Sequence, residues 1–367
     1  MTGLLLIDIG LTFGSPVGVI GQIRTASSIV GVIGALLIGA LSVRFRPKSL
    51  TMMGLSFMII SALGCSFALN FNMMLLFYTL VGVGMAIASP MTMTLVAEYF
   101  HLDKRGGAVG WLVAGGSLSY VIGAQVIAFI AGFGGWRLAF LGFVLPAQII
   151  SLLMVKVGLP STSHKPNATM SKGSYLEGFR AVFTDRSATA CVAGTMLHMA
   201  AFQALLLYGI SFFRQQFLIS PSYSSIVMTG AGLCFTVGSL LIGRFLTRFG
   251  RKPLTVLTTF IAGVLTISFT LSPNQWLALA TFFSGAWFFG AGVSAAQSLN
   301  LEQVPKFRGT MMSMSSAAGN VGSALGAGVG GLVLLLYGWE SVGISLGAMG
   351  IVATVIYYIL VIDPTIT

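Results

Sequence analysis

Few side chains in this sequence can carry a charge, and two of them lie inside long apolar stretches, where ionisable groups are costly. His198 falls eleven residues into such a stretch, about 16 Å deep at 1.5 Å per residue. An imidazole titrates near neutral pH and suits proton transfer, although a hydrogen bond to a neighbouring helix explains His198 equally well. Arg24 lies two turns into a stretch that begins at Val17. It either snorkels to the membrane surface or faces a cavity and attracts an anion.

Six further polar or amphipathic side chains lie within apolar stretches. Burying an amide in lipid without a partner is costly, so we expect these groups to face inward. There they either contact a solute or form hydrogen bonds between helices. These six candidates are Gln203, Gln297, Asn320, Tyr120, Gln125 and Trp287.

The composition identifies the class of protein that must hold these groups. Of the 367 residues, 56% are hydrophobic and only 7% are charged, whereas a soluble domain carries about 25% charged residues. A soluble enzyme and a nucleic-acid binder are thereby excluded, although the net charge is +11. The chain is expected to be an integral membrane protein made of α-helices.

The apolar runs predict eleven complete spans of about 20 residues each. Sixteen of the nineteen Lys and Arg residues fall into alternate loops, which the positive-inside rule places in the cytoplasm together with the C-terminus and the long central loop. We expect the cell membrane as the location. The runs cover residues 17–41, 50–69, 73–97, 108–133, 138–157, 188–213, 224–242, 254–271, 276–299, 311–336 and 342–362.

The sequence also repeats itself at an offset of 203 or 204 residues. A ten-residue segment beginning at Gly39 recurs at Gly243, and further pairs follow in equivalent loops. The repeat predicts two related six-helix bundles, with a solute site between them near the membrane midplane. The expected domains are an N-terminal half (1–158), a cytoplasmic linker with an amphipathic segment (159–187) and a C-terminal half (188–367). Within the repeat, the partner of the run 188–213 would begin before residue 1, so we expect a chain that lacks most of its first helix.

The repeated loops resemble the cytoplasmic signature of the major facilitator superfamily, G-x-x-x-D-R-x-G-R-R/K. The first copy matches at Gly39, Arg44 and Lys48; the second matches at Gly243, Arg248, Gly250, Arg251 and Lys252. Val43 and Thr247 replace the acidic residue that helps to latch the two halves in the family. The sequences around Glu98, Arg105 and Trp136 are similar to the drug/proton antiporter branch, whereas Tyr78 and Ala124 depart from two motifs of that branch.

Paired charges at the cytoplasmic helix ends predict a gate. Arg44 and Arg248 end helices where Glu98 and Glu302 end others, and such ion pairs can hold one conformation and open in another. The alternative is that these charges only obey topology. The full set of expected gating residues is Gly39, Arg44, Lys48, Glu98, Arg105, Gly243, Arg248, Arg251, Lys252, Glu302 and Arg308.

The resemblance and the residues together predict a secondary transporter that moves a small organic solute by alternating access. Proton-coupled efflux is our main hypothesis, and uptake or exchange of an organic anion through Arg24 is the alternative. A membrane enzyme is disfavoured because His198 has no partnered carboxylate, and a receptor or channel stays an alternative of another class. We expect the partners to be the lipid bilayer, a small-molecule substrate and protons. We expect no cofactor, metal or nucleic acid, and a monomeric chain.

Overall fold

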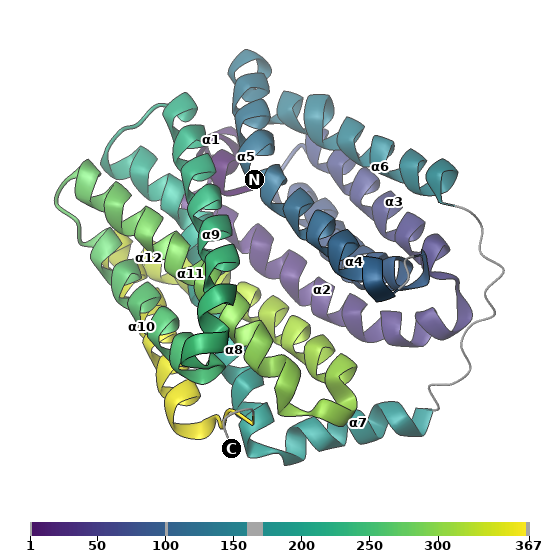
Figure 1. Ribbon diagram of the computed structural model, residues 1–367. Coiled ribbons are helices and arrows are strands. Elements are labelled where there is room, and N and C mark those ends of the chain that lie inside the picture. Colours follow the sequence, from purple (N-terminus) through teal and green to yellow (C-terminus); the bar gives the residue numbers. More distant parts are fainter. Residues whose placement is uncertain (1, 100–101, 160–171, 365–367) are drawn as a thin grey trace. The chain divides into compact units, whose positions relative to one another are not determined.

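The computed structural model describes residues 2–99, 102–159 and 172–364, and within these ranges it leaves some side chains undescribed. The described backbone is almost entirely helical (Figure 1). The helices are α1 (Thr2–Phe13), α2 (Val17–Arg44), α3 (Pro47–Ser66), α4 (Phe71–Tyr99), α5 (Leu102–Ala139), η1 (Phe140–Val144), α6 (Leu145–Gly158), α7 (Lys172–Thr184), α8 (Arg186–Gln216), α9 (Pro221–Phe249), α10 (Arg251–Thr270), α11 (Gln275–Gln303), η2 (Pro305–Phe307) and α12 (Arg308–Leu360).

These apolar sequences fold as helices because a lipid-embedded backbone must satisfy its polar groups within its own segment. Local signals set where several of them begin. Asp185, Ser220 and Asn274 accept backbone N–H bonds as N-caps of α8, α9 and α11, and proline occupies the first turn of α3 and α9, where its missing N–H is harmless.

In the described chain, nine helices are long and apolar enough to span a membrane, and two of these contain a sharp turn. The run from α5 to α6 turns at Gly134 and Gly135, and α12 turns at Gly338, so each provides two spans. Eleven spans result, which confirms the predicted number and the all-α fold. α1 is a shorter apolar helix.

The backbone repeats its unusual conformations at the predicted offset. Gly135 has φ 72° and ψ −175°, and Gly338 has φ 79° and ψ −173°. Only glycine adopts this region readily, so both turns depend on it. Gly14 and Leu218 form a second pair, with φ of 61° and 53°. The two halves therefore share their turn geometry as well as their sequence signature.

The chain divides into two compact units. The first comprises residues 7–15 and 26–169, and the second comprises residues 2–6, 16–25 and 170–367. The first turns of α1 and α2 thus belong to the second unit. Within the first unit, α3 packs on α4; within the second, α8 packs along α12, and α11 packs between α9 and α10.

Helix α7 falls where the amphipathic segment was expected and packs on the second unit. Its Val182 is fully buried with Cys191, Met311 and Tyr357 of α8 and α12, whereas Phe183 is exposed. Gly178 allows this close approach, because a Cβ there would lie 2.7 Å from Thr310 Oγ1. α7 is therefore a packed part of this unit.

Candidate functional site

His198 lies in the interior of the second unit and is fully buried. Its ring centroid is 5.2 Å from that of Phe289 on α11, and Phe289 in turn contacts Phe202 of α8 at 5.3 Å. Thr258 of α10 and Gly292 of α11 complete the surroundings. Neither ring nitrogen forms a hydrogen bond of good geometry with a described residue, and the polar group that interacts with the ring is the backbone of Phe289. This arrangement is uncommon, because buried polar groups are nearly always paired.

Arg24 is half-buried on α2, beside a set of contacts to α12. Gln22 Nε2 donates to Gly328 O at 3.4 Å, and Thr25 Oγ1 donates to Ala324 O at 3.3 Å. Tyr208 of α8 donates to the neighbouring Ala327 O at 2.8 Å. At 100° per residue, Arg24 points about 130° away from the middle of the face that Gln22 and Thr25 share. Its guanidinium is therefore not part of this helix contact.

The remaining solute candidates differ in position. Gln297 of α11 is exposed, and Asn320 of α12 is half-buried. Trp287 is half-buried and packs against Ile242, Ala291 and Ala295 at the contact of α9 with α11. Gln125 of α5 is exposed and has an interaction partner. Gln203 and Tyr120 lie outside the described side chains.

The structure also places two hydroxyl groups near Gln297. The hydroxyls of Ser239 on α9 and Ser294 on α11 form a hydrogen bond with each other. Ser294 is one turn from Gln297. Sequence reasoning missed both serines, because a serine in an apolar run gives no signal of its partner on another helix.

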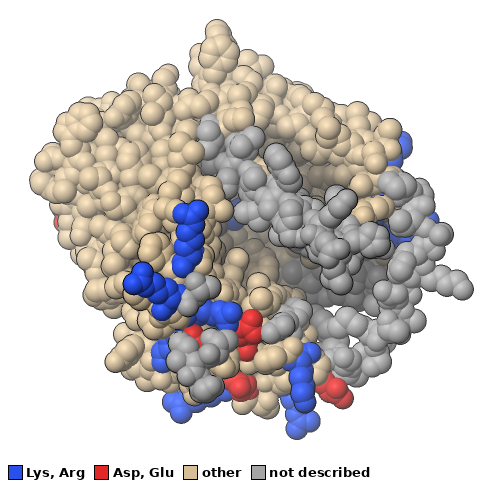
Figure 2. Space-filling model, viewed as in Figure 1, with Lys and Arg blue, Asp and Glu red and all other residues tan. Residues whose placement is uncertain are grey.

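Charged side chains of the second unit gather mainly at one of its ends, which we call the basic end (Figure 2). There Arg251, at the start of α10, forms an ion pair with Glu302, near the end of α11, with 3.7 Å between nitrogen and oxygen. The expected partner of Glu302 was Arg248. Arg248 is exposed and its guanidinium lies 5.5 Å from the centre of the Phe249 ring. Gly250, with φ 86°, starts a new helix after Arg248 and so places Arg251 beside α11.

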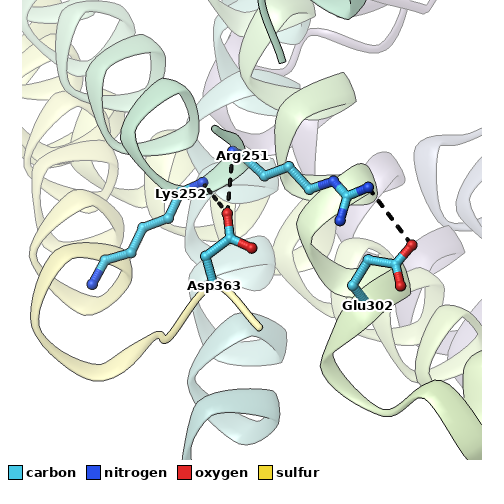
Figure 3. A network of polar contacts seen from close by, with 4 residues as sticks. All are labelled: Arg251, Lys252, Glu302 and Asp363. Atoms are coloured by element: carbon cyan, nitrogen blue, oxygen red, sulfur yellow. Dashed lines mark hydrogen bonds and ion pairs between the residues drawn. The ribbon is translucent and has the colours of Figure 1, made fainter. Parts of the chain in front are cut away.

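A carboxylate that sequence reasoning missed lies at the same place (Figure 3). Asp363, which follows α12 and is 6% exposed, accepts bonds from the backbone N–H groups of Arg251 and Lys252 at 3.2 and 3.3 Å. These are the first residues of α10, where unpaired N–H groups and the helix dipole favour a negative charge. Asp363 thus supplies a carboxylate to the loop in which Thr247 replaces the acidic residue of the signature.

Asp363 belongs to a larger set of contacts, the C-terminal clasp, which consists of Ser187, Gln303, Ile362 and Asp363 with the first amides of α10. The Ile362 N–H donates to Ser187 Oγ at 2.9 Å, and Gln303 Nε2 donates to Ile362 O at 3.0 Å. The Ser187 hydroxyl donates to Gln303 Oε1 at 2.6 Å. The clasp therefore joins the starts of α8 and α10 to the ends of α11 and α12.

The first unit has a corresponding contact of opposite charge. Lys48, at the start of α3, donates to the backbone carbonyls of Lys156 and Leu159 at the end of α6, the former at 2.9 Å. A cation is favourable there because the last carbonyls of a helix are unpaired. In each unit, the third span is thus tied to the end of the sixth.

The described side chains give no contact that supports a gating role for the other expected gating residues. Gly243 lies on an open face, where an added Cβ would meet nothing within 4 Å. Gly39 and Arg44 lie in α2, at positions whose side chains are not described, and the side chains of Glu98, Arg105 and Arg308 are likewise outside the described set. The described residues contain no group of three His, Cys, Asp or Glu side chains that could hold a metal.

These features define a class of protein: a multi-pass helical membrane protein made of two repeated halves, with polar groups inside the spans and charged contacts at the helix ends. The family model described as "Major Facilitator Superfamily" matches residues 1–215 and 201–366. The chain belongs to this superfamily and is a secondary transporter.

Curated relatives agree with this assignment, and two solved structures share the fold. A probable sugar efflux transporter of Pasteurella multocida is 26% identical over 358 residues, covering 97% of this chain and 86% of the relative. A probable 4-methylmuconolactone transporter of Cupriavidus pinatubonensis is 25% identical over 339 residues, covering 89% and 77%. The crystal structure of a mutant of the nucleoside transporter NupG matches with a TM-score of 0.81 at 16% identity, covering 98% of this chain and 94% of that one. The D-xylose–proton symporter matches with a TM-score of 0.78 at 18% identity, covering 99% and 94%.

Proposed function

We propose that this transporter exports a small organic solute in exchange for protons, and that His198 is the proton-binding group. The observation that carries the proposal is the fully buried imidazole whose two nitrogens form no hydrogen bond of good geometry and have only the backbone of Phe289 as a polar neighbour. The similarity to a probable sugar efflux transporter supports the efflux direction.

The surroundings of His198 give a physical reason for coupling. The described groups placed beside it are the ring and backbone of Phe289 and the backbone of Gly292, both on α11, with the Thr258 hydroxyl of α10 close to the same glycine. None of these three residues carries a charge, so protonation here would place a cation in a buried site without a counter-charge among them. The proton therefore binds in a conformation in which His198 is open to water. Because the proton binds this open conformation more tightly than the buried one, it shifts the equilibrium between the two conformations.

The test is transport by the purified full chain in proteoliposomes, with and without an imposed pH gradient. The pH gradient should accelerate solute movement by the native protein. His198→Gln should retain exchange without a gradient but lose the acceleration. His164→Gln, which changes a histidine of the central loop, is the matched control and should behave as the native protein does. A gradient response that survives in His198→Gln would contradict the role of His198, and a native protein that ignores the gradient would contradict proton coupling.

A second candidate is exchange of an organic anion through Arg24. No carboxylate pairs with Arg24 among the described side chains, and a probable 4-methylmuconolactone transporter is among the relatives. Under this proposal, Arg24→Gln abolishes the movement of carboxylates such as benzoate, with Arg214→Gln as the control. Unchanged carboxylate transport in Arg24→Gln would contradict it.

The ion pair of Arg251 with Glu302 is proposed to form in one state of the transport cycle and to open in another.

We further propose that the loops with most of the Lys and Arg residues, the central loop and the C-terminus face the cytoplasm of the cell. We also propose that the chain acts as a monomer and that it catalyses no covalent reaction. Single cysteines placed at Lys306 and at Glu340 should react with a membrane-impermeant maleimide from opposite sides of the membrane. Labelling of both from the same side would contradict this topology.

A further inference from the structure

Four side chains of the second unit lie at or beside the contact of α9 with α11. Phe235 and Ser239 lie one turn apart on α9, and Ser294 and Gln297 lie one turn apart on α11. The hydrogen bond between the two serine hydroxyls joins the helices. Gly290 permits this close approach, since a Cβ there would overlap the backbone of Phe235. We call these four residues the α9–α11 patch.

Gln297 points into the angle between α8 and α9. Ser294, three residues before it, bonds to α9, and Asn300, three residues after it, donates to Thr195 of α8 at 3.0 Å and to Ser315 of the adjoining α12 at 2.8 Å. At 100° per residue, Gln297 projects about 60° from each of these directions. Its amide is exposed there. An exposed amide in an apolar span is costly against lipid, so this direction is expected to hold water or a polar solute.

The chemistry of the patch is polar without charge. The Gln297 amide offers two donors and one acceptor oxygen, and the two serine hydroxyls keep one donor and several lone pairs after bonding to each other. Phe235 stacks on Phe202 of α8, with 4.8 Å between ring centroids and 19° between planes. The face of Phe235 that does not stack on Phe202, one turn from the Ser239 hydroxyl on α9, suits the apolar face of a ring that carries hydroxyls.

We propose that the α9–α11 patch binds the solute and selects a small neutral compound with several hydroxyl groups. From the level of Gly290 to Gln297 the helix advances seven residues, about 10 Å, enough for contacts at both ends of such a ring. Gln297 and the two serines are the specificity-determining groups, and Phe235 supplies the apolar surface. This inference rests on the proposed function of solute transport and names the substrate class.

The test is counterflow exchange by the full chain in proteoliposomes, with radiolabelled D-glucose and lactose as neutral probes and benzoate and succinate as charged probes. The native protein should exchange at least one neutral probe. Gln297→Ala and Ser294→Ala should each raise KM for that probe about 10-fold, because each removes hydrogen bonds to the solute, while the maximal rate stays near that of the native protein. Ser284→Ala, which changes an exposed serine on the same helix, is the matched control and should leave KM unchanged.

The outcomes separate this inference from the proposed function. Unchanged KM in both Gln297→Ala and Ser294→Ala would overturn the inference, and so would a native protein that exchanges only the carboxylates. Either result would leave solute transport intact. A correctly folded native protein that exchanges no probe, with or without a pH gradient, would overturn the proposed function as well. Monodisperse gel filtration of every variant shows that a raised KM does not come from misfolding.

Discussion

The indole N–H of Trp136 donates a hydrogen bond to Thr12 Oγ1 at 2.9 Å, and this contact has a counterpart in the other half. There the indole N–H of Trp339 donates to Gln215 Oε1 at 3.1 Å. Donor and acceptor are 124 residues apart in both pairs. Each tryptophan therefore joins the first helix of its half to the sixth, although the acceptor has changed from a hydroxyl to an amide.

Replacing Trp339 with Phe should lower the free energy of unfolding by about 1 kcal/mol, because it keeps most of the ring and removes the hydrogen bond. Trp339 is 8% exposed and also packs edge-on against Phe212. Thermal unfolding in detergent measures the change. Trp276→Phe alters a tryptophan that is 75% exposed and should have no effect; an equal loss in both variants would contradict the assignment.

Removal of the Asp363 carboxylate should loosen the start of α10. Asp363→Ala removes both acceptor bonds and should cost about 1 kcal/mol, with faster hydrogen–deuterium exchange of the Arg251 and Lys252 amides. Asp363→Asn keeps an acceptor and loses only the charge, so its effect should be smaller. Exposed Glu340 provides the control variant Glu340→Ala, which should leave this exchange unchanged. Unaltered exchange in Asp363→Ala would show that the carboxylate does not cap α10.

Gly292 makes room for His198, so adding a methyl group there should be destabilising. A Cβ on Gly292 would lie 2.8 Å from His198 Cε1 and 3.3 Å from Nε2. Gly292→Ala should cost about 1–3 kcal/mol through overpacking, and His198→Ala should relieve part of that cost in the double variant. Gly285→Ala on the same helix meets nothing nearer than 3.7 Å and is the control. Additive effects of Gly292→Ala and His198→Ala would refute the contact.

Leu218 adopts a left-handed conformation that favours glycine. Its φ is 53°, its side chain is 85% exposed, and the equivalent residue of the first half is Gly14. Leu218→Gly should raise the free energy of unfolding by about 0.5–1 kcal/mol, since the strain removed exceeds the added freedom of the unfolded chain. Leu271→Gly, at an exposed position with φ −89°, should be destabilising in the same unfolding assay. A loss of stability in Leu218→Gly would contradict this reasoning.

The number of spans, the repeat and the class of protein could be predicted from the sequence, because a membrane imposes one simple rule on every segment. An apolar run of sufficient length must be a helix. The sharp turns were harder to predict from the sequence. The runs 108–133 and 138–157 are joined by a two-residue reversal, and its geometry depends on the backbone angles of Gly134 and Gly135.

Most contacts within the candidate site could not be predicted from the sequence. Asp363 lies 112 residues from Arg251, and Ser239 lies 55 residues from Ser294, so no local pattern links them. The choice between Arg248 and Arg251 as partner of Glu302 depends on Gly250, whose positive φ redirects the chain between the two arginines. The positions of His198 and Gln297 along their helices were predictable, but the neighbours on other helices that define their environments were not.

The opposite charges that tie the third span to the sixth in the two halves also bear on how the protein arose. Lys48 binds helix-end carbonyls in one half, and Asp363 binds helix-start amides in the other. Neither contact uses a residue of the other unit, so a substitution in one contact leaves the other intact. We therefore expect that the two halves of a duplicated chain can change these contacts independently of each other.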